Sequence, residues 1–108
     1  MGKPPKTRVI ERTSPEKRQA LQGILEALPG VSCDQQRARV FQALQFGPLN
    51  TFEASRCLDI YHPPKRIEEL RDQGHHIVLH WIRIETEVGV VHRVGQYALR
   101  VTEGARHA

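Results

Sequence analysis

The first third of the chain carries apolar residues at the spacing of one face of an α-helix. They recur at intervals of three and four as far as Leu28. Ser14 and Pro15 suit the start of this helix, because serine caps free amides and proline fits the first helical position. The pair Pro29-Gly30 ends the pattern. We predict a helix over residues 14–30 whose apolar face packs on the rest of the domain or on a second subunit.

A second helix is expected from Ser32 onward. Ser32 and Gln35 have the spacing of a capping box, and apolar residues at helical spacing follow as far as Leu44. Gly47 is expected to take the left-handed conformation that ends many helices, and Pro48 cannot continue the helix. The next two residues are predicted to form a short extended link.

Two shorter helices are predicted next, and they are separated by a tight turn. Thr51 is expected to cap the third helix, whose body covers residues 52–58. A fourth helix is expected over residues 65–73, opened by Pro63-Pro64 and closed by Gly74. Two prolines cost little there, because amides in the first turn have no partner within the helix.

The period of the pattern then changes to that of β-strands. Residues 76–85 are β-branched and aromatic, and residues 90–101 return after a short connection that contains glycine. Gly95 interrupts the second strand and indicates a bulge or a close backbone contact. Trp81 is expected to anchor the core or its edge, with base stacking as the alternative. The segment therefore predicts a β-hairpin.

The predicted order is helix, extended link, short helix, turn, helix and hairpin. We predict an α+β winged helix-turn-helix, with a three-helix core, a two-stranded C-terminal wing and an extra N-terminal helix. Two helices joined by a few residues must cross steeply, so the fourth helix projects outward. A projecting helix fits the major groove of B-DNA.

The N-terminal end of the fourth helix holds the candidate base contacts. We expect His62, Lys65 and Arg66 to meet base edges or phosphates, with help from the helix dipole. Lys65, Glu69 and Asp72 are expected on the outward face, where Glu69 accepts from a cytosine amine. The alternative interpretation is a solvated face of mixed charge. Arg71 is expected at the core edge, as an ion-pair or capping partner.

Further candidate contacts lie outside the fourth helix. Arg83 and Arg93 of the hairpin are expected to enter a minor groove, where negative potential is concentrated. Polar residues on an exposed strand face are the alternative interpretation. Thr51 and Arg56 are candidates for phosphate contact, although capping alone explains Thr51.

Residues 37–99 resemble the small helix-turn-helix domains that are common in bacterial, prophage and phage proteins. The resemblance rests on the threonine-led segment TFEAS, the segment RIEELRDQGHHI, the closing QYAL, and RVFQAL before them. It implies a winged DNA-binding module with a regulatory role, such as a transcriptional or prophage regulator. The Pro63-Pro64 pair departs from the expected start of a recognition helix, so the base-reading positions stay open.

Charge favours a polyanionic partner, but its distribution is uneven. The net charge is +4, and residues 1–18 carry six Lys/Arg against two acids, so the remaining residues are neutral overall. Residues 1–13 are expected to form a disordered basic arm, and residues 103–108 a frayed tail. Residues 14–30 and 31–102 are assigned to the first helix and the winged domain. With no apolar span or secretory signal, we expect a cytoplasmic, nucleoid-associated protein without membrane contact.

Other functions have weaker support. His76 and His80 fall about 13 Å apart on a strand, and no Cys-x-x-Cys pair is present, so no metal site is expected. No phosphate loop or activated nucleophile is visible, and Cys33 and Cys57 are expected to be reduced thiols. We expect double-stranded DNA as the partner, a possible homodimer, and no catalysis, cofactor or small-molecule ligand. The main alternative is a winged-helix adaptor that binds protein and not DNA.

Overall fold

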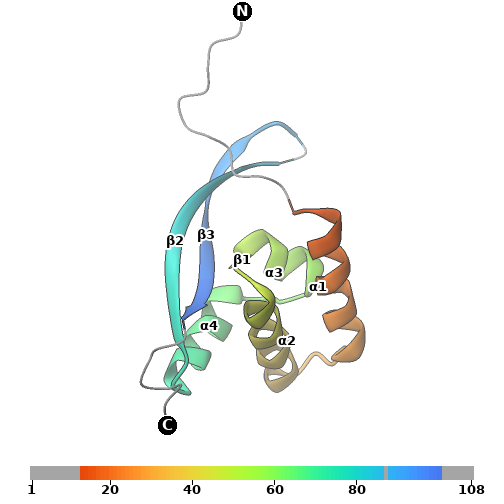
Figure 1. Ribbon diagram of the computed structural model, residues 1–108, viewed down its shortest axis with the longest axis vertical. Helices are drawn as coiled ribbons and strands as arrows, with labels where there is room; N and C mark the ends of the chain where they lie inside the picture. Colours follow the sequence, from red (N-terminus) through yellow and green to blue (C-terminus); the bar gives the residue numbers. More distant parts are fainter. Residues whose placement is uncertain (1–12, 87, 101–108) are drawn as a thin grey trace, which may run out of the picture.

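The computed structural model describes residues 13–86 and 88–100, which form four helices and three strands (Figure 1). The predicted arm before Thr13 and the predicted tail lie outside the described residues. In chain order the elements are α1 (Pro15–Ala27), α2 (Cys33–Phe46), β1 (Leu49–Asn50), α3 (Thr51–Cys57), α4 (Pro63–Asp72), β2 (His76–Glu85) and β3 (Val91–Arg100). The predicted α+β class and the order of elements are confirmed.

Local capping sets the helix starts. Ser14 Oγ accepts from the amide of Lys17 at 3.1 Å, as expected for the start of α1. α3 differs from the prediction, because Asn50, and not Thr51, is its cap. The Asn50 side chain accepts from the Glu53 amide at 2.8 Å, and the Glu53 carboxylate accepts from the Asn50 amide at 3.1 Å. This reciprocal capping box releases the Thr51 hydroxyl for another contact.

Gly47 ends α2, but not in the left-handed conformation that was predicted. Its φ of 167° is extended backbone, and its amide donates to Ala43 O at 3.1 Å. The extended conformation directs the chain straight into β1. There Leu49 pairs with Tyr97 and Asn50 pairs with Gln96. The sheet therefore has three strands in the order β1-β3-β2. β2 and β3 form the predicted two-stranded wing, and the predicted extended link pairs with β3 as a third strand, which the sequence did not predict.

The hairpin of β2 and β3 is antiparallel and its register is continuous from His76↔Arg100 to Glu85↔Val91. Gly95 pairs directly with Trp81, so no bulge forms there. A Cβ at Gly95 would lie 2.9 Å from Leu79 Cδ1, which identifies the glycine as a site of close approach. In Figure 1 the hairpin curves along one side of the helices and extends beyond them.

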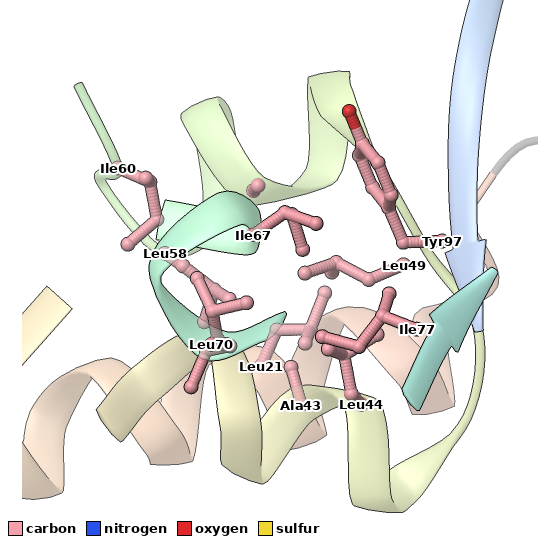
Figure 2. Close-up of a cluster of buried hydrophobic side chains, with 12 residues drawn as sticks. Leu21, Ala43, Leu44, Leu49, Leu58, Ile60, Ile67, Leu70, Ile77 and Tyr97 are labelled. Atoms are coloured by element: carbon pink, nitrogen blue, oxygen red, sulfur yellow. The ribbon is translucent and has the colours of Figure 1, made fainter. Parts of the chain in front are cut away.

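One hydrophobic core joins all four helices to the base of the sheet (Figure 2). Leu21 of α1 is fully buried in it, in the same cluster as Leu44 of α2 and Ile67 of α4. The apolar face of α1 thus packs within its own chain, in contact with α2 and α3. The core members are Leu21, Val40, Ala43, Leu44, Leu49, Ala54, Leu58, Ile60, Ile67, Leu70, Ile77 and Tyr97.

Trp81 does not belong to this core. Its side chain is 57% exposed on the outer part of the hairpin, so the predicted core anchor is wrong. The register explains the difference: the pair Ile77↔Leu99 lies at the base of the hairpin beside the core, whereas Trp81 lies four residues further along β2. No helix in the described part of the chain has the length and apolarity that a bilayer crossing requires.

Candidate nucleic-acid interface

The turn between α3 and α4 fixes the direction of α4. Asp59 has a left-handed backbone with φ of 55°, a conformation that aspartate tolerates better than most residues. The next amide, of Ile60, donates to Ala54 O at 3.0 Å. Leu58 and Ile60, on either side of Asp59, are both buried. The turn is therefore held by core packing on both sides of Asp59.

A buried arginine supports this turn from beneath. Arg39 of α2 is 1% exposed, and its Nε donates to Leu58 O at 2.7 Å and its Nη2 to Asp59 O at 3.3 Å. Its Nη1 donates to Leu28 O at 2.5 Å and to Gly30 O at 2.7 Å. These carbonyls follow the ends of α1 and α3, where the helix dipoles are negative. The guanidinium thus connects two helix ends by hydrogen bonds that compensate its burial.

Gln36 has a similar role one turn earlier on α2. It is 3% exposed, its Nε2 donates to Val31 O at 2.9 Å, and its Oε1 accepts from the Tyr61 amide at 3.3 Å. Sequence reasoning missed both residues. Their positions in the sequence could have identified them. Gln36 and Arg39 occur among the apolar positions of this helix, where a buried polar side chain needs hydrogen-bond partners.

The outer face of α4 is exposed and has no net charge. Lys65 is 53% exposed, and its Nζ lies 3.6 Å from Glu68 Oε1. Arg71 donates through Nε and Nη2 to Ile77 O at 3.0 and 2.9 Å, which agrees with the structural role predicted for it. The exposed members of this face are Pro64, Lys65, Glu68, Arg71 and Asp72.

Arg66 and Glu69 are not presented on that face as expected. Arg66 is 8% exposed, and its Nη2 donates to Glu69 Oε2 at 3.0 Å, while its Nη1 lies 3.2 Å from Cys33 Sγ. Arg37 of α2 donates to the other Glu69 oxygen at 2.8 Å. The predicted outward orientation of these two side chains is wrong, because paired charges hold them toward α2.

The same contacts set the protonation of Glu69. The hydrogen bond from Arg37 lowers the pKa of the Glu69 carboxyl below its ordinary value, and the charge of Arg66 acts in the same direction. Desolvation raises this pKa but is outweighed. Reciprocally, the bond to Glu69 raises the pKa of Arg37. The carboxylate therefore stays ionised and joins α4 to α2.

The start of α4 has no free backbone amide to offer to an anion. Pro63 and Pro64 have no N–H, and the amides of Lys65 and Arg66 both donate to His62 O, at 3.0 and 3.4 Å. The His62 side chain is exposed and makes no capping bond. Local attraction for a phosphate must therefore come from side chains and the helix dipole.

The outer hairpin gathers a second set of exposed cations. Arg83 and Arg93 are directly opposite each other in the register, and both are exposed. The guanidinium carbon of Arg93 lies 4.5 Å from the ring centroid of Trp81. Trp81 and Arg83 are two residues apart on β2, so their side chains share one face of the hairpin. Arg93 lies directly opposite Arg83 and is therefore on that face as well.

Thr51 and Arg56, the last two predicted contacts, belong to α3. The Thr51 hydroxyl donates to Gly95 O at 3.3 Å, so it joins α3 to the wing. Arg56 is exposed, and its guanidinium carbon lies 4.9 Å from the Phe52 ring centroid. Among the described residues, no group of three or more histidine, cysteine and acidic side chains has the geometry of a metal site.

Comparison with known proteins adds one finding. A family model described as a winged helix-turn-helix domain matches residues 35–102, from the first turn of α2 to just past β3. α1 lies outside the matched segment. No curated protein and no solved structure gives a significant match.

Proposed function

Because the chain belongs to the winged helix-turn-helix domain family, we propose that it binds double-stranded DNA through α4 and the hairpin. The observation that carries the proposal is the pair Arg83 and Arg93. Like charges placed directly opposite each other across a ladder destabilise a sheet. A polyanion that lies over the pair relieves this repulsion, so the arrangement fits a surface for phosphate.

On α4, Lys65 and His62 are the proposed groove contacts. Both are exposed near the N-terminal end of the helix, which carries the positive pole of its dipole. Arg66 and Glu69 were expected to read bases as well. We now propose that they act as positioning residues, because their contacts with Arg37 and with each other set the angle of α4 on α2.

On the wing, Arg83 and Arg93 are the proposed minor-groove contacts. The Trp81 ring already holds the Arg93 guanidinium in place in the free protein. Arg93 therefore loses less conformational entropy when it binds DNA. Arg56 remains a proposed phosphate contact. Thr51 is proposed to position the wing, because its single hydroxyl proton is already donated to Gly95 O and phosphate only accepts.

The mobility-shift or anisotropy titration that tests this proposal uses mixed-sequence duplex DNA at several salt concentrations. We expect the logarithm of the association constant to fall linearly with the logarithm of the salt concentration, with a slope of about −0.9 for each phosphate contacted. Absence of binding at low salt contradicts the proposal. That result favours an adaptor that binds protein, for which the lack of net charge on the outer face of α4 is the supporting observation.

The proposed biological role is control of transcription, in a bacterium or a prophage, by a non-catalytic protein associated with the nucleoid. The support is the family alone, because the helix-turn-helix motif commonly places a recognition helix in the major groove of DNA. Genome-wide crosslinking of the tagged protein tests the role. Enrichment at promoter regions is expected, and a uniform distribution contradicts it.

A further inference from the structure

Trp81 is a large aromatic side chain that the fold leaves uncovered. It is the only tryptophan of the chain, and its side chain is 57% exposed on the outer part of the hairpin. The residue directly opposite it in the register is Gly95, which has no side chain to cover the ring. Aromatic residues in sheets commonly gain stability from the side chain directly opposite. The rung that carries Trp81 therefore presents a single exposed indole.

The neighbours of the indole on this face are apolar on one side and cationic on the other. Leu79, which is 39% exposed, shares the face of Trp81 because the two residues are two positions apart on β2. Arg83 lies two positions beyond Trp81, with Arg93 directly opposite it. We call the exposed surface formed by Leu79, Trp81, Arg83 and Arg93 the wing stripe.

A regular duplex leaves the indole of the wing stripe without a matching partner. In B-DNA the bases stack on one another, and the grooves expose only their edges. Arginine can bind phosphate along any backbone, whereas an aromatic ring stacks on the face of a base. Base faces are exposed where a strand is unpaired. An indole flanked by cations therefore fits single-stranded nucleic acid better than an uninterrupted duplex.

We propose that the wing stripe binds single-stranded DNA, with one unpaired base stacked on Trp81 and the adjoining phosphates at Arg83 and Arg93. The two arginines lie two rungs from Trp81, about 7 Å along the strand direction. A base and its own flanking phosphates can span that distance. The Arg93 guanidinium contacts the ring, yet more than half of the Trp81 side chain remains exposed to receive the base.

The wing stripe adjoins the duplex surface proposed on α4, and the inference rests on that proposed function. Arg71 of α4 donates to Ile77 O at the base of β2, where α4 lies beside the hairpin (Figure 1). Trp81 is four residues further along the same strand, roughly 13 Å. One DNA molecule can therefore contact both surfaces where a duplex held by α4 opens into single strands. The preferred ligand is a junction between duplex and single-stranded DNA.

Tryptophan fluorescence tests the stacking directly, because the chain has one tryptophan. The full chain is titrated with a duplex that carries a single-stranded thymidine overhang and with the same duplex without an overhang. A third probe carries an overhang of abasic nucleotides, which keeps the phosphates and removes the bases. We expect quenching and the tightest binding with the thymidine overhang alone. Equal quenching by the blunt duplex or by the abasic overhang overturns the proposal, because neither offers an unpaired base.

Fluorescence anisotropy of labelled DNA extends the test to variants that lack the indole. Trp81→Leu should lower the ratio of overhang affinity to blunt-duplex affinity at least fivefold, and Trp81→Phe should retain most of the preference. Phe46→Leu, an equally exposed aromatic position on α2, is the matched control and should leave the ratio unchanged.

The outcomes separate this proposal from the proposed function. An unchanged ratio in Trp81→Leu overturns the stacking of a base on the wing stripe. Blunt-duplex binding without any preference for the overhang overturns this proposal alone, whereas absence of binding to every probe overturns duplex binding as well.

Discussion

Arg83 and Arg93 face each other directly across the β2–β3 ladder, and Arg93 also lies 4.5 Å above the ring of Trp81. Two like charges at one rung cost stability in the free protein, and the indole offsets part of that cost for one of them. An anion that lies over such a pair relieves the repulsion between the two charges. The wing is therefore the part of the surface at which we propose that phosphate binds.

Replacing both arginines tests this demand. The double variant Arg83→Gln/Arg93→Gln should bind duplex DNA more weakly and reduce the magnitude of the salt slope by about two. Its thermal stability should be equal or slightly higher, because the repulsion is removed. Fluorescence anisotropy across salt concentrations measures the first effect, and calorimetry the second. Arg100→Gln, at the base of the hairpin, is the matched control, and an equal loss of affinity there would contradict the assignment.

The two adjacent cations of α4 should separate by function. Lys65→Ala should lose about 1 kcal/mol of DNA binding at unchanged melting temperature, because Lys65 is exposed and weakly paired. Arg66→Ala should lower stability by about 1–3 kcal/mol, because it leaves Glu69 with one guanidinium fewer. Thermal unfolding and DNA titration of both single variants distinguish a DNA contact from a residue that stabilises the fold. A stable Arg66→Ala protein that has lost DNA binding would support the direct DNA contact that was first expected of Arg66.

Arg39 should be the most sensitive polar position of the fold. Arg39→Met fills a similar volume but leaves the carbonyls of Leu58 and Gly30 without their donor. We expect a loss of about 3 kcal/mol or more in urea unfolding. Gln45→Met, exposed on the same helix, is the control for added side-chain bulk. A loss below about 1 kcal/mol for Arg39→Met would show that water replaces the guanidinium.

Acid should weaken the α2–α4 contact through Glu69. The folded-state pKa of this carboxyl is lowered, so its contribution is fully present above the unfolded pKa of about 4.3 and is lost as pH falls toward the folded value. Urea unfolding between pH 7 and pH 3 should therefore show a steeper loss for the natural chain than for Glu69→Gln. Identical pH profiles for the two chains would exclude this linkage.

Sequence reasoning was most successful where structure is local. The cap at Ser14 and the bounds of β2 were predicted, because capping residues and strand periodicity are read within a few positions. The cap of α3 was missed by one residue, since Asn50 and Thr51 are both good caps. Only the reciprocal contact with Glu53 distinguishes them.

Side-chain direction was predicted less well. Glu69 has the spacing of an outward residue, yet it is turned to Arg37, which lies 32 positions earlier in the chain. Trp81 has the character of a core residue, yet the hairpin carries it beyond the core. In both cases a distant element decides the environment, and no local pattern reports that element's position.

The sequence by itself determined the elements, their order and their family, because helix and strand periods, caps and turns are short-range properties of the chain. Tertiary structure alone decided which cations remain exposed, because that depends on whether a carboxylate or carbonyl from another element lies within reach. Arg66 and Arg39 meet such partners and stabilise the fold, whereas Lys65, Arg83 and Arg93 remain exposed. The geometry that pairs some charges and exposes others therefore defines the proposed DNA surface.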